Sequence, residues 1–177
     1  IATRVNNVFA DLYLRGGSDQ LPPVQALALY YDFRELTPVG TDGDEMVRRL
    51  ADRLVSVDLL QQAAELLDYQ VQFRLRGEEK AAVASRLAAI YLFAREPQKA
   101  LEALASSRWR TAALPLVRER NLIEAQALAE LKRYDDALAL LNGDNSRDAM
   151  LLRGDIQWRS QNWRAAATSL DQYMTDR

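Results

Sequence analysis

Four segments of this sequence repeat one spacing of small and large residues, and that spacing constrains the fold more than any other feature. In "AQALAELKRYDDALALL", residues 125–141, Ala125 is followed three residues later by Leu128, nine later by Tyr134, twelve later by Ala137 and sixteen later by Leu141. The same template fits residues 51–67, 88–104 and 154–170. Its second small residue recurs at intervals of 37, 37 and 29 residues, as Ala63, Ala100, Ala137 and Ala166. A period in this range indicates a repeat architecture.

The template is that of two antiparallel helices in close contact. Small residues at its first and twelfth positions let the two helices approach each other, while the large residues between them and the leucine at the sixteenth position fill the seam. No part of the sequence shows the alternation of apolar and polar residues, flanked by hairpin turns, that a strand requires. We therefore predict an all-α array of antiparallel helix pairs.

On these residues the sequence resembles the tetratricopeptide repeat (TPR) family. The consensus small residue of helix A matches Ala51, Ala88, Ala125 and Gly154, and the consensus alanine of helix B matches the four alanines given above. The repeats are degenerate, because Lys132 stands at the usual glycine position of the third unit and the terminal proline is absent from every unit. The resemblance covers roughly residues 44–176. It implies a right-handed superhelical solenoid, one continuous domain with repeats at about 44–77, 78–110, 111–144 and 145–177.

Two further helices are expected ahead of these repeats, at about residues 2–15 and 22–36. Their predicted apolar faces are Val5, Val8, Phe9 and Leu12 in the first helix, and Val24, Leu27, Ala28 and Tyr31 in the second. They lack the small-residue template. We therefore predict that residues 1–43 form a divergent helix pair that caps or continues the stack.

The composition removes most common enzyme chemistries, because the 177 residues include no histidine and no cysteine. Thiolate nucleophiles, imidazole bases and His- or Cys-based metal sites are therefore excluded. Carboxylates remain, but no pair of them is singled out by its position. We expect a protein that is not an enzyme and that needs neither a cofactor nor a metal.

The sequence constrains the partners and the cellular location of the protein less than it constrains its chemistry. The net charge is −5 for residues 1–70, +5 for 71–133 and −2 for 134–177, but acidic residues alternate with the basic ones in the middle, so nucleic-acid binding is not expected. No apolar run is long enough to insert into a membrane. The chain begins at Ile1 without a methionine, which suggests a fragment of a longer protein. The cytoplasm and the bacterial periplasm or envelope both remain open.

The acidic stretch "TPVGTDGDE", residues 37–45, raises the question of a cation site. Its ligand spacing does not fit a calcium loop, and it lacks the lysine and the several glycines of a phosphate loop. We predict instead a helix start, with Asp42 as N-cap and with Asp44 and Glu45 in the first turn.

The resemblance implies a partner-binding groove along the A helices. Matching positions are Arg48, Asp52, Phe93, Gln126, Glu130, Asp155, Trp158 and Arg159. Trp158 is the expected peptide anchor, or else it packs against a helix outside this sequence, whereas Trp163 at a packing position is expected in the core. The carboxylate clamp of some family members is not implied, because its asparagines are absent and Asp52 would repel a carboxylate.

A second tryptophan-containing segment, "SSRWRT" at residues 106–111, places Trp109 between two arginines. It is either a basic contact point or, as we favour, a side chain tucked over the repeat edge. As a whole the chain is expected to be a noncatalytic scaffold for a protein or peptide partner. The alternatives are a structural module that self-associates through its terminal repeats, and an accessory domain of an enzyme.

Overall fold

The computed structural model describes residues 2–175, and within them every regular element is helical. The described residues form two compact units that divide between Leu75 and Arg76. None of the helices within 2–175 combines the length and apolar character that a transmembrane span requires. The repeat boundaries and the grouping of residues 1–43 as a divergent pair stay predictions.

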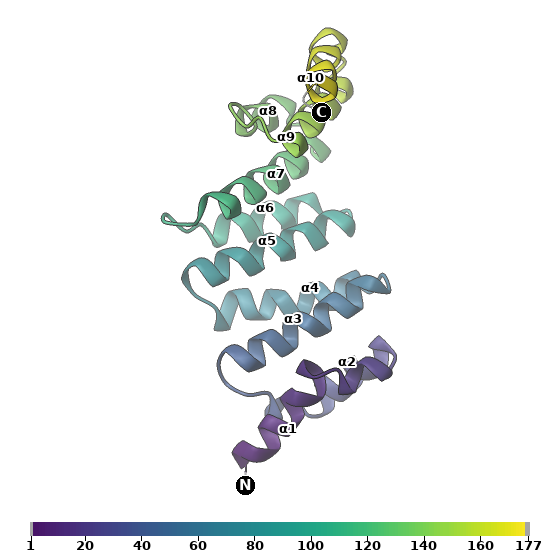
Figure 1. The fold of residues 1–177 in the computed structure, drawn as a ribbon, viewed down its shortest axis with the longest axis vertical. Coiled ribbons are helices and arrows are strands. Elements are labelled where there is room, and N and C mark those ends of the chain that lie inside the picture. The colour runs from purple at the N-terminus through teal and green to yellow at the C-terminus, as the bar shows by residue number, and fades with distance from the viewer. Residues whose placement is uncertain (1, 176–177) are drawn as a thin grey trace. The chain divides into compact units, whose positions relative to one another are not determined.

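The first unit contains four α-helices and three short helical turns (Figure 1). Helix α3 lies at its centre and contacts α1, α2 and α4. A hydrogen bond from the Tyr13 hydroxyl to the Ala26 carbonyl, 2.8 Å long, joins α1 to α2. In chain order the elements are α1 (Ala2–Leu14), η1 (Gly17–Gln20), α2 (Pro23–Asp32), η2 (Arg34–Leu36), α3 (Thr41–Ser56), α4 (Leu60–Tyr69) and the π-helical η3 (Gln70–Arg74).

The faces predicted for the two N-terminal helices are partly wrong. In α1 the buried residues are Phe9, Ala10 and Tyr13, whereas Val5 and Val8 are exposed. In α2 the buried residues are Ala26 and Leu27, and three of the predicted positions are exposed, namely Val24, Ala28 and Tyr31. The reason is that α1 packs mainly on α3 and on the turns η1 and η2, and α2 packs on α3. Each helix is therefore covered on one side only, and the buried stripe is narrower than predicted.

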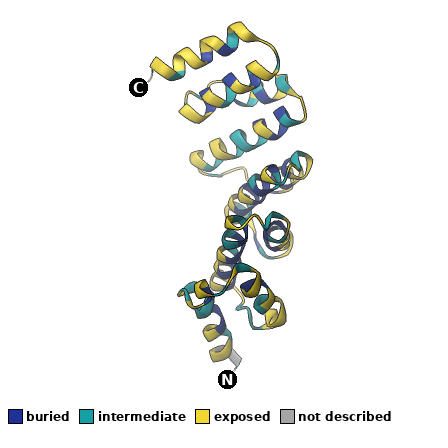
Figure 2. Cartoon of the chain, turned by 90° about the vertical axis from the view of Figure 1, so that its right-hand side faces the viewer, coloured by how far each residue is buried: buried dark blue, intermediate teal, exposed yellow. Residues whose placement is uncertain are grey.

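The second unit is a series of three helix pairs. The members of each pair contact each other, and α7 also contacts α5 and α9. The elements are α5 (Gly77–Phe93), α6 (Pro97–Ser106), α7 (Leu114–Glu130), α8 (Tyr134–Leu140), α9 (Arg147–Arg159) and α10 (Trp163–Thr175). Exposed residues cover much of α10 (Figure 2), because among the described elements α10 packs mainly on α9.

The small residues of the template lie where the spacing predicts. All eight are buried: Ala51, Ala63, Ala88, Ala100, Ala125, Ala137, Gly154 and Ala166. The contact is closest in the last pair, where a Cβ atom at Gly154 would lie 3.1 Å from Leu170 Cδ2. The leucine positions follow the template in three pairs, but Leu170 is 39% exposed, since it lies on the sparsely covered α10.

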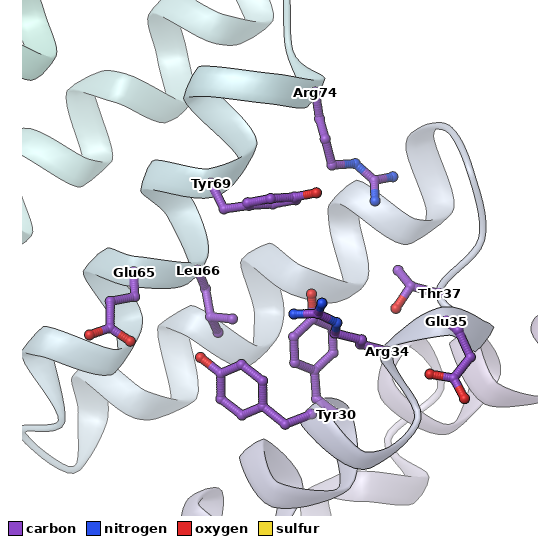
Figure 3. Close-up of a pocket in the computed structure, with 9 residues that line it drawn as sticks. Tyr30, Arg34, Glu35, Thr37, Glu65, Leu66, Tyr69 and Arg74 are labelled. Carbon is purple, nitrogen blue, oxygen red and sulfur yellow. The ribbon is translucent and has the colours of Figure 1, made fainter.

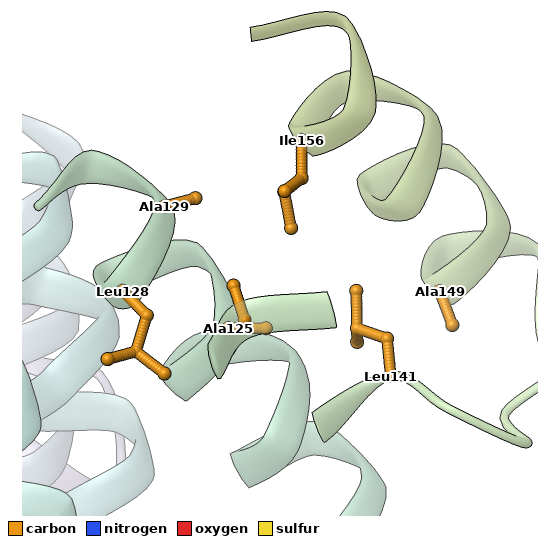
Figure 4. Close-up of a cluster of buried hydrophobic side chains, with 7 residues drawn as sticks. Ala125, Leu128, Ala129, Leu141, Ala149 and Ile156 are labelled. Atoms are coloured by element: carbon orange, nitrogen blue, oxygen red, sulfur yellow. The ribbon is translucent and has the colours of Figure 1, made fainter. Parts of the chain in front are cut away.

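Ala137 offers a test of this packing, because it is fully buried and belongs to the same core cluster as Ala125, Leu141 and Ile156, which Figure 4 labels. Replacing Ala137 with Leu should lower the free energy of unfolding by about 1–3 kcal/mol, since the added methylenes have no space. Urea denaturation measures the change. Ala139→Leu, at an exposed position of the same helix, is the control and should change stability by less than about 0.5 kcal/mol. Equal effects of the two substitutions would contradict the template.

Candidate functional site

A pocket of about 350 Å³ lies within the first unit, between the α2–η2 segment and the α4–η3 segment (Figure 3). It combines aromatic rings with charged groups of both signs. Its lining residues are Tyr30, Tyr31, Arg34, Glu35, Thr37, Glu65, Leu66, Tyr69 and Arg74. Hereafter this is called the tyrosine–arginine pocket.

Local structure explains how these residues come together. The α2–η2 segment "YYDFRELT" supplies residues 30–37, and its two adjacent tyrosine rings meet edge to face with their centroids 5.6 Å apart. On the opposite wall, residues 65, 66 and 69 share one face of α4, since residues three and four apart are neighbours on a helix. The π-helical turn after α4 then carries Arg74 to the pocket.

Arg74 is held in place by the acidic stretch that precedes α3. Its Nε lies 2.7 Å from the Asp44 carboxylate, and its Nη2 donates to the Pro38 carbonyl at 3.3 Å. Gln70 adds a hydrogen bond from Nε2 to the Asp44 carbonyl, 3.0 Å long. Asp44 is therefore a buried ion-pair partner of Arg74. Together with the hydrogen bonds, this ion pair joins residues 37–44 to η3.

The prediction of Asp42 as N-cap is wrong, although Asp42 and Asp44 do lie in the first turn of α3. The helix begins at Thr41, so the N-cap residue is Gly40, whose φ of 101° is accessible to glycine. No side chain caps this helix end. Sequence reasoning placed the cap too late because it relied on the preference of aspartate for that position.

The pocket contains several hydrogen-bond donors that have no acceptor among residues 2–175. Thr37 Oγ1 is buried and has no partner among the described residues. Within residues 2–175 the structure likewise records no hydrogen bond or ion pair for Arg34 and none for the hydroxyls of the three tyrosines. Burial raises the pKa of Tyr30, and burial together with the Glu65 charge raises the pKa of Tyr31, so both phenols remain protonated at neutral pH.

The residues predicted for the groove are distributed over both units. Arg48 and Asp52 lie half-buried on α3 of the first unit. In the second unit Phe93 ends α5, while α7 carries Gln126 and Glu130 and α9 carries the rest. Arg159 Nε and Asp155 Oδ2 form an ion pair at 2.8 Å. Within residues 2–175 no side-chain hydrogen bond or ion pair is recorded for Phe93, Gln126 or Glu130.

Of the two C-terminal tryptophans, Trp163 does not have the core position predicted for it, whereas the groove role of Trp158 stays a prediction. Trp158 is 59% exposed and Trp163 is 53% exposed. Their rings form an edge-to-face pair with centroids 4.7 Å apart and planes at 76°. Trp163 is therefore not a core residue. The same template position is only half-buried in the other three pairs, at Leu60, Pro97 and Tyr134, and among the described elements α10 packs mainly on α9.

Trp109 lies against the start of α5. A Cβ atom at Gly77 would be 3.5 Å from Trp109 Cζ2, so the indole covers this glycine while remaining 47% exposed. This position agrees with the favoured prediction of a side chain tucked over the repeat edge.

No protein-family model matches the sequence, and no curated protein is similar to it at a significant level. Two solved structures of MamA, a TPR-like helical-repeat protein, do match its fold. One is MamA from residue 41 to its end, from Desulfovibrio magneticus RS-1, with a TM-score of 0.70 and 16% identity over 98% of this chain and 94% of that chain. The other is the ArsTM double mutant of MamA RS-1, with a TM-score of 0.71 and 15% identity over 96% and 93% of the two chains. The chain therefore has an all-α, TPR-like solenoid fold.

Proposed function

We propose that this chain is a noncatalytic protein-interaction scaffold that binds a peptide or protein segment on the A helices of its second unit. The observation that carries the proposal is the exposed pair formed by Trp158 and Trp163, hereafter the tryptophan pair. TPR-like solenoids also present extended surfaces that suit such binding.

The tryptophan pair has the properties of an interface anchor. Each ring is more than half exposed, and together they present a large apolar surface next to charged groups. Because each ring supports the other edge to face, little side-chain freedom is left to lose when a partner covers them. Rigid aromatic groups of this kind dominate the binding energy of many interfaces.

Polar groups that could orient a bound segment lie on α9, which carries Trp158, and on the neighbouring A helix α7. The ion pair of Asp155 and Arg159 flanks Trp158 and is about half exposed, so its groups can exchange partners at small cost. Helix α7 contacts both α5 and α9, and it carries Gln126 and Glu130. These residues, together with Phe93, are the proposed secondary contacts.

Truncation of the anchor tests this proposal. Peptides are selected from a random display library on the wild-type chain, and their affinities are measured by fluorescence anisotropy. Trp158→Ala should weaken the selected peptides by roughly 30-fold, the factor that corresponds to about 2 kcal/mol. Because Trp158 is largely exposed, the far-ultraviolet circular dichroism of the variant should remain that of the wild type.

Trp109→Ala is the matched control, since it removes another half-exposed indole from the second unit. It should leave the affinities within about twofold. Equal losses in the two variants would contradict an anchor at Trp158. If Trp158→Ala changed only the oligomeric state in light scattering, the tryptophan pair would instead be a self-association surface.

A further inference from the structure

We propose that the tyrosine–arginine pocket is a second binding site, separate from the tryptophan pair, and that it takes a carboxylate attached to a small apolar body. The ligand is either a free organic acid or the carboxylate of a protein segment, which present the same chemistry. The site lies entirely within the first unit.

The surplus of donors points to a ligand that accepts hydrogen bonds. Arg34, Thr37 and the three tyrosine hydroxyls contribute donors, and none of them has an acceptor within the described residues. A buried hydroxyl without a partner, such as Thr37 Oγ1, is costly unless something fills the site. A ligand rich in acceptors would satisfy this group.

Among the described residues Arg34 is a lining cation without an ion pair, and on this ground we propose an anion as the acceptor, although Glu35 and Glu65 also line the pocket. Arg74 is already neutralised by Asp44 at 2.7 Å, whereas Arg34 has no ion pair within residues 2–175. A guanidinium group matches a carboxylate with two parallel N–H···O bonds. Arg34 is therefore the proposed primary contact of the ligand.

The position of the acidic side chains orients the ligand. In Figure 3, Glu65 lies on the opposite side of the pocket from Thr37 and Arg74, and the guanidinium of Arg34 lies between the two sides. Glu65 repels an anion at its own side. Glu35 lies on the other side, next to Thr37, and in this view its carboxylate points away from Thr37 and from the guanidinium of Arg34. The carboxylate would therefore lie toward Thr37 and Arg74, with the apolar body among the tyrosine rings and Leu66.

The opposite charge preference is the main competing interpretation. Tyrosine rings with a nearby glutamate can hold an organic cation. Here Arg34, which has no ion pair among the described residues, would meet such a cation inside the pocket and repel it. The volume, near the lower end for ligand sites, suits one small group of either charge, so charge is the property to test.

Calorimetric titration of the whole chain with three probes of the same shape tests the charge. The probes are 3-phenylpropionate, its neutral amide and the cationic 3-phenylpropylammonium ion. We expect the acid to bind at least about tenfold more tightly than the amide, as a charge-assisted hydrogen bond implies. Equal affinity of acid and amide, tighter binding of the ammonium ion, or no heat from the acid at about 10 mM would each overturn the proposal.

Variants assign the binding to these side chains. Arg34→Gln should weaken the acid about tenfold or more, and Thr37→Val, which keeps the shape but removes the hydroxyl, should weaken it several-fold without loss of stability. Arg15→Gln, at an exposed arginine of the same unit, is the matched control and should have no effect. An unchanged affinity in Arg34→Gln would contradict the assignment.

Two peptides distinguish the sources of the carboxylate. Acetyl-Ala-Glu-Phe-Ala-amide presents an acidic side chain within a segment, and the same peptide with Gln in place of Glu is its neutral control. Binding of the acidic peptide but not its control indicates a protein ligand, whereas binding of 3-phenylpropionate alone indicates a free acid. Trp158→Ala should leave all these affinities unchanged, so failure at the tryptophan pair and failure at this pocket can be told apart.

Discussion

Replacing Arg120 with Met should lower the free energy of unfolding of the second unit by about 3 kcal/mol. The guanidinium of Arg120 donates four hydrogen bonds that join three helices. Nη1 donates to the Ala81 carbonyl at 2.7 Å and to Ser85 Oγ at 3.3 Å, and Nη2 donates to the Leu104 carbonyl at 2.7 Å and to Ser107 Oγ at 3.1 Å. Methionine keeps much of the packing volume but removes all four of these donated bonds, although the Ala81 and Leu104 carbonyls still accept from Ser85 Oγ and Ser107 Oγ.

The experiment is urea denaturation followed by tryptophan fluorescence, which reports only on the second unit because the three tryptophans are at positions 109, 158 and 163. Arg118→Met is the matched control, an exposed arginine on the same helix, and it should change stability by less than about 0.5 kcal/mol. Similar stabilities of the two variants would mean that the Arg120 contacts contribute little.

An arginine contact of the same kind recurs in the last pair. Arg153 on α9 donates to the carbonyls of Leu141 and Asp144, each at 2.7 Å. Leu104 and Leu141 occupy the same template position near the end of a B helix, and each carbonyl accepts a backbone hydrogen bond, from the amide of Ser107 and of Asp144 respectively. In both cases an arginine of the next A helix adds a further donor.

This contact could not be predicted from the sequence, although the helix pairs could. Arg120 lies five residues before its small residue Ala125, whereas Arg153 lies one residue before Gly154, so the two arginines share no template position. A long flexible side chain can reach the same carbonyl from different positions. Small residues cannot vary in this way, because a larger side chain at the points of closest approach would force the two helices apart, and they therefore identified the pairs.

The sites were predictable to a smaller degree. Trp158 is exposed, and its groove role stays a prediction. The burial predicted for Trp163 is wrong, because its template position is only half-buried even in the pairs that other helices follow. The tyrosine–arginine pocket was missed because it joins residues 30–37 to residues 65–74. The only local signal was the pair of adjacent tyrosines followed by Arg34, and the opposite wall depends on how α4 and its π-helical turn pack.

Replacing Gly43 with Ala should lower the free energy of unfolding of the first unit by about 3 kcal/mol or more. A Cβ atom at Gly43 would lie far inside van der Waals contact with the Pro38 carbonyl oxygen and 3.2 Å from Thr37 Cγ2. Backbone atoms cannot move aside as a flexible side chain can, so α3 and the 37–40 segment must separate. Because Arg74 also binds the Pro38 carbonyl, the separation should weaken that contact and open the tyrosine–arginine pocket.

Hydrogen exchange over residues 37–75, compared with urea denaturation followed by circular dichroism, measures this change in the first unit. Asp42→Ala introduces the same side chain one residue earlier, at an exposed position, and should cost only about 0.3–1 kcal/mol through the lost charge at the helix start. A large loss in Gly43→Ala beside a small one in Asp42→Ala would show that the glycine of this acidic stretch serves the close approach of two backbone segments. Equal small losses would mean that the segment can relax around a side chain, and the fixed position of Thr37 in the pocket would then have to be abandoned.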